Sequence, residues 1–359
     1  MTWFKKKAHI FSLFILILTV LYSITVTGGV HATPAPKHAH KKIDVYVAGS
    51  TNHDKYNYIP TYWKNGIPVY LTDGNRQGKA TGIVVIGNDV YVSGDVEGKG
   101  RTIATYWKNG VAVSLTDGKN KASATGIAVV GKDIYVSGYE AGNNASYVAM
   151  CWKNGVAYRL SDGNHHEPTT AIAVSGNDVY VAGYEQDLHH LHSIVAKYWK
   201  DGQAVLLPPA DKEATASGIA VVGNDVYVAG QQRGKFAYMV KYWKNGEEIS
   251  LSDKEGIGAC SRAILVMGND VYVTGAVNGS DYNLYPVYWK NGKEINLSTP
   301  IRKRNGYAEA IAVVGKNIYV AGEENNGKCS VAEYWENGKA IQLSDGKHIS
   351  EAYAIAVVR

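Results

Sequence analysis

Charged and aromatic residues at one position of a repeated segment are the first candidates for chemistry in this 359-residue chain. Four repeats carry a small hydroxyl residue at that position, whereas the last three carry Arg262, Glu309 and Tyr353. A guanidinium binds carboxylate or phosphate through paired hydrogen bonds, so these residues could bind a small polar ligand. The alternative is that Arg262 and Glu309 form an ion pair with each other. The sequence leaves both interpretations open.

A second group joins tyrosine to glutamate. Tyr139-Glu140 and Tyr184-Glu185 occupy equivalent positions in consecutive repeats. Tyrosine offers rigid, amphipathic area that suits a protein or glycan surface. Glycosidases need two carboxyl groups about 5–10 Å apart, but nothing in the spacing of Glu140 and Glu185 singles them out. We therefore treat these four residues as ligand-binding candidates and expect no catalytic residue.

A third group is rich in histidine. His165 and His166 precede one repeat, and His189, His190 and His192 lie in the loop that follows. Imidazole together with carboxylate suits zinc, nickel or copper, and a histidine-rich loop could also respond to pH. None of these histidines has the helical spacing of a preformed metal site, so a solvated polar loop is the alternative. We expect no cofactor.

Nucleophilic chemistry has little support in the sequence. The chain contains neither a G-x-S-x-G elbow nor a phosphate-binding G-x-x-x-x-G-K-S/T segment. It has three cysteines, and Cys151 takes the place of a tyrosine that precedes tryptophan in other repeats. We expect Cys151 to be a buried core thiol, and a binding protein is favoured over an enzyme.

The elements that must position these residues come from a repeat of 44 to 47 residues. Three sequence signatures each occur seven times: I-D-V-Y-V-A-G, Y-W-K-N-G and A-x-G-I-A-V-V-G, or close variants. The second signature places tryptophan at Trp63, Trp107, Trp152, Trp199, Trp243, Trp289 and Trp335. Seven solvent-facing tryptophans could stack on sugars, but packing between repeats is the favoured interpretation.

One repeat can be divided into four strands, at residues 80–86, 89–93, 102–107 and 111–115. Gly87-Asn88 and Asn109-Gly110 supply the tight hairpin turns, because these residues tolerate positive φ. Four antiparallel strands at a period near 45 residues are typical of a β-propeller blade. The sequence predicts an all-β, seven-bladed propeller. Its first blade is closed by both termini, because residues 43–48 form a second strand and residues 352–358 a first strand.

The repeats resemble those of bacterial secreted and surface seven-bladed propellers, most of them uncharacterised, that carry Y-W-K-N-G and G-N-D-V-Y-V-A-G runs. The resemblance covers residues 43–359 and concerns the fold, since these motifs say little about activity. The chain lacks the Gly-His and Trp-Asp pairs of WD40 repeats and the Gly-Gly doublet of kelch repeats. The partners of those two families therefore cannot be transferred to it.

The N-terminus has the pattern of an export signal. Three lysines at positions 5–7 precede an apolar stretch at 10–21, and a small-x-small cleavage site ends at Ala32. We predict a signal peptide at 1–32, with an uncleaved anchor as the alternative, and an exposed linker at 33–42. Residues 1–42 hold six lysines and no acid, so the formal charge is −1 for 43–359 against +5 for the whole chain. Nucleic acid is therefore not an expected partner.

The sequence thus predicts an exported binding or scaffold module, secreted or at the cell surface, that presents a ligand or partner surface on one face of the propeller. That face carries the long loops, where binding residues concentrate. The expected partner is an extracellular glycan or protein, with no membrane contact beyond the export signal, and the expected state is a monomer. The alternative is a carbohydrate-active enzyme, a polysaccharide lyase or hydrolase with its site at the mouth of the central channel.

Overall fold

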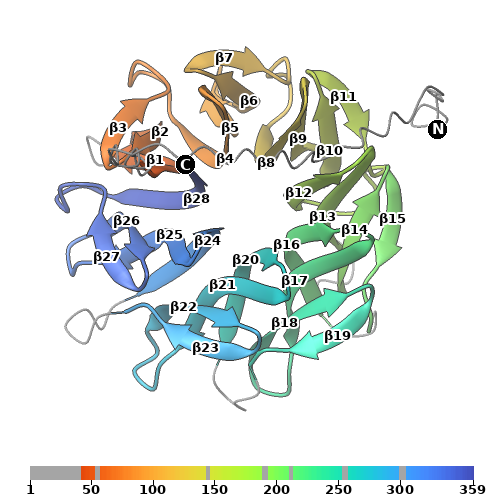
Figure 1. Cartoon of the computed structure of the whole chain (residues 1–359). Helices are drawn as coiled ribbons and strands as arrows, with labels where there is room; N and C mark the ends of the chain where they lie inside the picture. The colour runs from red at the N-terminus through yellow and green to blue at the C-terminus, as the bar shows by residue number, and fades with distance from the viewer. Residues whose placement is uncertain are drawn as a thin grey trace, which may run out of the picture. The chain divides into compact units, whose positions relative to one another are not determined.

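The computed structural model describes residues 42–52, 57–142, 146–187, 193–209, 213–252, 258–298 and 305–359. The strands in these ranges form seven four-stranded antiparallel sheets. Figure 1 shows the sheets as blades arranged in a ring. The predicted all-β, seven-bladed propeller is confirmed. Within the described ranges, no helix is long and apolar enough to cross a membrane.

Each blade contributes one strand to each of four concentric positions. The innermost strands are β28 (Ser350–Val358), β4 (Gly78–Ile86), β8 (Ala122–Val130), β12 (Thr169–Ser175), β16 (Ala214–Val222), β20 (Ala259–Met267) and β24 (Gly306–Val314). The second strands are β1 (Asp44–Asn52), β5 (Asp89–Glu97), β9 (Asp133–Ala141), β13 (Asp178–Gln186), β17 (Asp225–Arg233), β21 (Asp270–Asn278) and β25 (Asn317–Asn325).

The two outer positions complete the blades. The third strands are β2 (Tyr58–Lys64), β6 (Thr102–Lys108), β10 (Tyr147–Lys153), β14 (Ile194–Lys200), β18 (Tyr238–Lys244), β22 (Leu284–Lys290) and β26 (Ser330–Glu336). The outermost strands are β3 (Ile67–Tyr70), β7 (Val111–Ser114), β11 (Val156–Arg159), β15 (Gln203–Leu206), β19 (Glu247–Ser250), β23 (Lys293–Asn296) and β27 (Lys339–Gln342). Blade 1 consists of β28, β1, β2 and β3, and blades 2 to 7 follow in chain order.

Blade 1 takes its strands from both ends of the propeller sequence. β28 pairs antiparallel with β1, with Val47 opposite Ile355, and β1 pairs in turn with β2. The innermost strand of this blade is thereby joined to a second strand that lies about 300 residues earlier in the chain. Pairing of this kind leaves no unpaired strand edge at the centre of the ring.

The repeated tryptophans form the packing between blades. All seven are at most 1% exposed. Trp107 of blade 2 lies in one apolar cluster with Tyr46 and Ala48 of blade 1 and with Ile83 of its own blade. The packing interpretation of the tryptophans is therefore confirmed, and a sugar-stacking role for them is excluded by their burial.

The asparagine turns are also structural. Asn109 and Gly110 both have positive φ, at 51° and 81°, as a tight hairpin turn requires. The Asn109 side chain accepts a hydrogen bond from the backbone N–H of Val90 and donates one to Asp89, both at 2.8 Å. The repeated motif thus fixes the hairpin rather than a functional site.

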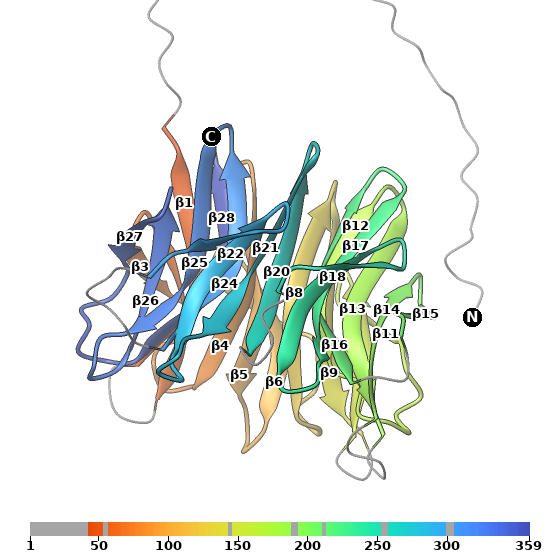
Figure 2. The ribbon, with the colours of Figure 1, turned by 90° about the horizontal axis from the view of Figure 1, so that it is seen from below.

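The propeller has two faces, which Figure 2 shows edge-on. The short-turn face carries the turns that join the first strand to the second and the third to the fourth. The long-loop face carries the second-to-third loops, such as 98–101, and the connections between blades, such as 115–121. On the short-turn face, the repeated lysine of six blades pairs with an aspartate at 2.7–3.5 Å, as Lys108 does with Asp89. These lysines are neutralised and form no basic surface.

Candidate functional site

A β-bulge occurs in the innermost strand of every blade, at the position that the sequence comparison singles out. The strand register shifts at these residues, so each innermost strand has an extra residue outside the regular pairing at the same position of its blade. The bulged residues are Thr81, Thr125, Thr170, Ser217, Arg262, Glu309 and Tyr353, and in β20 the bulge also includes Ala263. All seven are partly exposed. We call the end of the channel that they share with the long-loop face the mouth.

Arg262 and Glu309 form an ion pair with each other, which is one of the two interpretations that the sequence left open. Arg262 Nε lies 3.0 Å from Glu309 Oε1, and the guanidinium lies 4.8 Å from the centre of the Tyr307 ring. The Glu309 side chain is 15% exposed and that of Arg262 39%. Burial raises the pKa of Glu309, and the charge of Arg262 opposes this shift. Arg262 is therefore paired with Glu309, and part of its side chain is still exposed to solvent.

Tyr353 belongs to a separate set of contacts on the neighbouring blades. Its hydroxyl donates to a carboxylate oxygen of Glu351 and accepts from Lys79 Nζ at 2.8 Å. Lys79 also forms an ion pair with Glu351 at 3.2 Å. Burial, followed by the charge of Glu351, raises the pKa of the Tyr353 hydroxyl well above its usual range. Tyr353 is thus a hydrogen-bonding group and not a base.

Glu323 lies opposite Tyr307 in the pairing of β24 with β25. It comes from β25 in blade 7 and is 8% exposed. Burial raises the pKa of Glu323 well above its usual range, and the charges of Glu309 and Glu351 raise it further. Within the described residues, its Oε2 atom has no hydrogen-bond partner. The mouth therefore contains three carboxyl groups and two paired cations.

The tyrosine–glutamate pairs do not form one site, because successive side chains of a strand point to opposite faces of a sheet. Tyr139 stacks on Tyr147 with ring centres 4.3 Å apart. Glu140 lies in a separate hollow, where it accepts a hydrogen bond from Asn120 at 3.2 Å. Tyr139 and Glu140 therefore have different surroundings.

Glu185 of the second dipeptide is neutralised by a buried lysine. Lys197 is 3% exposed, lies 2.7 Å from Glu185 and also contacts the buried Glu167. The lysine side chain lies over the ring of Trp199 at 5.0 Å. Tyr184 is partly buried, and burial raises its pKa. Glu185 is thus part of an ion-pair network with the buried Lys197 and Glu167.

The histidine group is only partly within the described residues. His165 Nε2 lies 3.7 Å from Glu185, and the His166 ring lies 4.5 Å from that of Tyr147. His189, His190 and His192 lie outside the described residues. In the part of the chain that the structure describes, no group of three or more His, Cys, Asp and Glu side chains could hold a metal ion. The metal hypothesis gains no support from His165 and His166.

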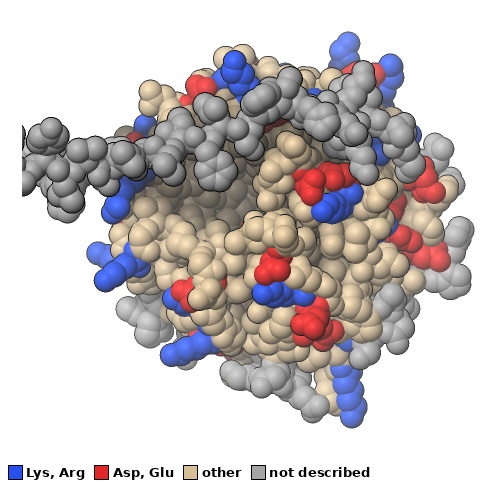
Figure 3. Space-filling view, turned by 45° about the vertical axis from the view of Figure 1, so that its right-hand side comes forward, with Lys and Arg blue, Asp and Glu red and all other residues tan. Residues whose placement is uncertain are grey.

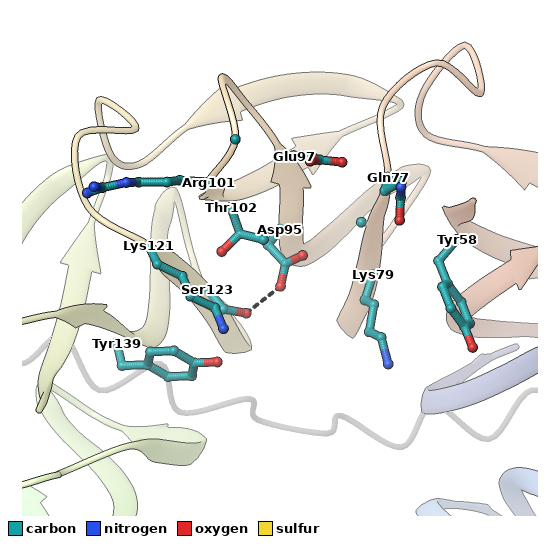
Figure 4. A pocket seen from close by; sticks show the side chains of 12 residues that line it. Tyr58, Gln77, Lys79, Asp95, Glu97, Arg101, Thr102, Lys121, Ser123 and Tyr139 are labelled. Atoms are coloured by element: carbon teal, nitrogen blue, oxygen red, sulfur yellow. Dashed lines mark hydrogen bonds between the residues drawn. The ribbon is translucent and has the colours of Figure 1, made fainter. Parts of the chain in front are cut away.

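A pocket of about 560 Å³ opens on the long-loop face over blade 2 and its neighbours. We call it the blade-2 pocket. Figure 4 shows its main side chains, which come from blades 1, 2 and 3: Tyr58, Lys79, Asp95, Lys121, Ser123 and Tyr139. Only Tyr139 among these is a residue that the sequence analysis proposed. Tyr58 and Tyr139 lie at opposite sides of the group, with Asp95 and Ser123 between them (Figure 4).

The polar floor of this pocket is preorganised. Ser123 Oγ donates a hydrogen bond to Asp95 Oδ2 at 2.5 Å. Burial raises the pKa of Asp95, while the Ser123 hydrogen bond and the charge of Lys79 oppose the shift. Lys79 lies over the rings of both Tyr58 and Tyr353, at 5.3 and 5.2 Å. Lys79 therefore joins the pocket to the mouth.

The sequence contains a pattern that could have identified Lys79 and Ser123 as candidates. Lys79 and Ser123 lie two positions before the bulge, a position that also varies among blades and carries Glu351, Pro168, Thr215, Cys260 and Tyr307. The predicted strand at 80–86 starts too late, because β4 begins at Gly78. Extending the comparison by two residues would have identified this second variable ring.

Neither the surface nor the thiols suggest another kind of site. Figure 3 shows Lys and Arg side chains next to Asp and Glu on the visible face, in small groups and not in one patch of either sign. Cys151 is buried, as expected, and burial raises the pKa of its thiol to about 12. Such a thiol is protonated at neutral pH and is a poor nucleophile.

The comparisons with known proteins are limited to the fold. No protein-family model and no curated protein matches the chain. It is similar to the solved structure of a Mycobacterium tuberculosis puromycin-hydrolyzing peptidase, with 10% identity, a TM-score of 0.43 and coverage of 74% of this chain and 52% of the peptidase. It is also similar to a thermostable family-43 glycoside hydrolase, with 12% identity, a TM-score of 0.36 and coverage of 63% and 94%. This chain spans about half the length of the peptidase chain, and similarities this distant carry no functional argument.

Proposed function

We propose that this protein is an exported binding module that holds an extracellular glycan in the blade-2 pocket. The observation that carries the proposal is the combination of two tyrosine walls with a preorganised polar floor in one pocket on the long-loop face. The propeller supplies a rigid scaffold, and the loops and strand ends of three blades supply the binding side chains.

The chemistry of the pocket suits a saccharide. A sugar ring has apolar C–H faces, which pack on aromatic rings, and an edge of hydroxyl groups, which need hydrogen-bond partners. Tyr58 and Tyr139 provide the rings, while Asp95, Ser123 and Lys79 provide donors and acceptors. The volume of about 560 Å³ lies in the range of small-molecule sites.

Binding is better supported than catalysis. A lyase or hydrolase at the mouth needs a general base whose pKa lies near the working pH. The pKa of Tyr353 is raised, which disfavours the phenolate. Glu185 is held by the buried Lys197. The alternative of a polysaccharide lyase or hydrolase is therefore not favoured.

The proposed site of action, outside the cytoplasm, rests on the sequence. The basic and apolar leader at 1–32 supports export, and the near-neutral charge of 43–359 supports a partner other than nucleic acid. A monomer that is secreted or retained at the cell surface would meet its glycan outside the cell. Fractionation of expressing cells, with the protein found outside the cytoplasm, is the expected result.

A glycan array with the purified protein tests the proposal, followed by calorimetry of any saccharide that binds. Tyr58→Ala removes one wall, and the expected loss of affinity is roughly 10-fold, because an aromatic contact contributes about 0.5–1.5 kcal/mol beyond its buried area. Phe236→Ala is the matched control, since Phe236 is 66% exposed and lies outside the pocket. Binding that Tyr58→Ala and Phe236→Ala weaken equally, or no binding of any glycan, would contradict the proposal.

A further inference from the structure

We infer that the saccharide carries a primary ammonium group, as a free amino sugar does, and that this group compensates the charge of Glu323 at the mouth. The inference rests on the proposed function and names the class of glycan. It depends on residues at the mouth, of which only Lys79 also borders the blade-2 pocket: three carboxyl groups and two cations, each paired with one of them.

The carboxyl groups come from three strands of blades 7 and 1. Glu309 lies on β24, Glu323 on β25 and Glu351 on β28. The two outer groups each have a cation: Arg262 Nε lies 3.0 Å from Glu309, and Lys79 Nζ lies 3.2 Å from Glu351. Each cation also lies over a tyrosine ring, Arg262 over Tyr307 and Lys79 over Tyr353. Glu309 and Glu351 are therefore each paired with a cation that also lies over a tyrosine ring.

The middle position lacks its cation. Glu323 is more than nine-tenths buried, and its Oε2 atom has no hydrogen-bond partner in the described part of the chain. The described residues also include no lysine, arginine or histidine in an ion pair with it. In the pairing of β24 with β25, Glu323 lies opposite Tyr307, two positions before Glu309. The charges of Glu309 and Glu351 both act on Glu323. The charge of Arg262 and a hydrogen bond from the Ala352 backbone offset part of the charge of Glu323. A buried carboxylate that is compensated only in part is unfavourable.

An ammonium group would supply both a positive charge and hydrogen-bond donors for Glu323. It carries one positive charge and three hydrogen-bond donors in a compact group, which matches an acidic position without a donor. The carboxylate torsion of glutamate is soft, so the Glu323 oxygens can turn toward the mouth at little cost. When all three acids are ionised, they outnumber the two cations at the mouth, and this excess of negative charge favours a cationic ligand.

The mouth and the blade-2 pocket can be occupied by one saccharide. Lys79 borders the pocket, and it contacts both Glu351 and Tyr353 at the mouth. A sugar ring held in the pocket can therefore place a substituent, or the next residue of an oligomer, toward Glu323. This continuity favours an amino glycan over an isolated small amine.

The experiment compares two forms of one oligosaccharide, β-1,4-linked glucosamine and the same oligomer with every amine acetylated, by calorimetry with the purified protein. We expect the amine form to bind roughly 10-fold more tightly, since a hydrogen bond to a charged group is stronger than one between neutral groups. The preference should weaken as ionic strength rises. Glu323→Gln should bring the ratio of the two affinities close to one.

Matched controls separate the possible outcomes. Glu247→Gln makes the same change at an exposed position on β19 and should leave the ratio as in the unmodified protein. If the acetylated oligomer binds as well as the amine form, the inference fails and the proposed glycan function stands. If no saccharide binds, both fail. If a lysine-rich peptide binds and the amino glycan does not, the ammonium comes from a protein, and the inference is overturned.

Discussion

Replacing Glu323 by glutamine should stabilise the unliganded protein, and the gain should grow with pH. Glu323 is 8% exposed, and one carboxyl oxygen lacks a hydrogen bond in the described part of the chain. A buried polar group without its hydrogen bond costs about 1–3 kcal/mol, and more when it is charged. The amide of glutamine removes the charge and turns a donor toward Glu309 and Glu351. We expect a gain in unfolding free energy of about 1–3 kcal/mol at pH 8.

The sign of the pH dependence follows from the pKa of Glu323, which is raised in the folded state. Between the ordinary carboxyl pKa, about 4.3, and the folded value, the native protein binds more protons than the unfolded chain. The stability of the unmodified protein therefore falls as pH rises through this range. Glutamine does not titrate, so the stabilisation by Glu323→Gln should be small at pH 4 and largest at pH 8.

Denaturant titrations of both proteins at pH 4 and pH 8 measure this difference. Glu247→Gln is the control, because Glu247 is exposed on β19, and it should change the unfolding free energy by less than about 0.5 kcal/mol at either pH. A gain of equal size at pH 4 and pH 8, or a loss of stability at pH 8, would refute the reasoning. The same variant should lose its preference for an amino glycan, which would make Glu323 a residue kept for binding at a cost in stability.

Two further predictions concern the scaffold. Trp107→Ala should lower the unfolding free energy by about 3–5 kcal/mol, because the ring is fully buried between blades 1 and 2; chemical denaturation measures the loss, and a change below 1 kcal/mol would contradict the packing role. Lys197→Met should cost about 3–5 kcal/mol at pH 7 by leaving Glu167 and Glu185 without their buried cation, and the loss should shrink in the double variant with Glu185→Gln, whereas an equal loss in the double variant would argue against the ion pair.

The repeat made the architecture predictable because its signals are local. A hairpin turn such as Asn109-Gly110 depends on the φ values of two adjacent residues, and seven copies of such turns define the blades. The burial of Trp107 could likewise be inferred from its recurrence at one position of every repeat. The end of each strand was harder to place, since β4 begins two residues before the predicted start.

The candidate site was predicted only in part. Arg262, Glu309 and Tyr353 were identified because they break the pattern of one repeat position, and the structure places all three at the mouth. The sequence did not show that the alternation of side chains along β9 gives Tyr139 and Glu140 different neighbours. Comparison of single positions does not show which neighbours meet in space.

The sequence by itself determined the seven four-stranded blades, the turns that close them and the tryptophan packing that joins them. These features depend on residues that are close in the chain or that recur in every repeat. Only the tertiary structure decided which variable residues meet. Lys79 contacts Tyr353 from 274 positions away in the chain, and Ser123 reaches Asp95 across a blade boundary. Such contacts depend on the closure of the ring and on the bulge in each innermost strand, which no single repeat encodes.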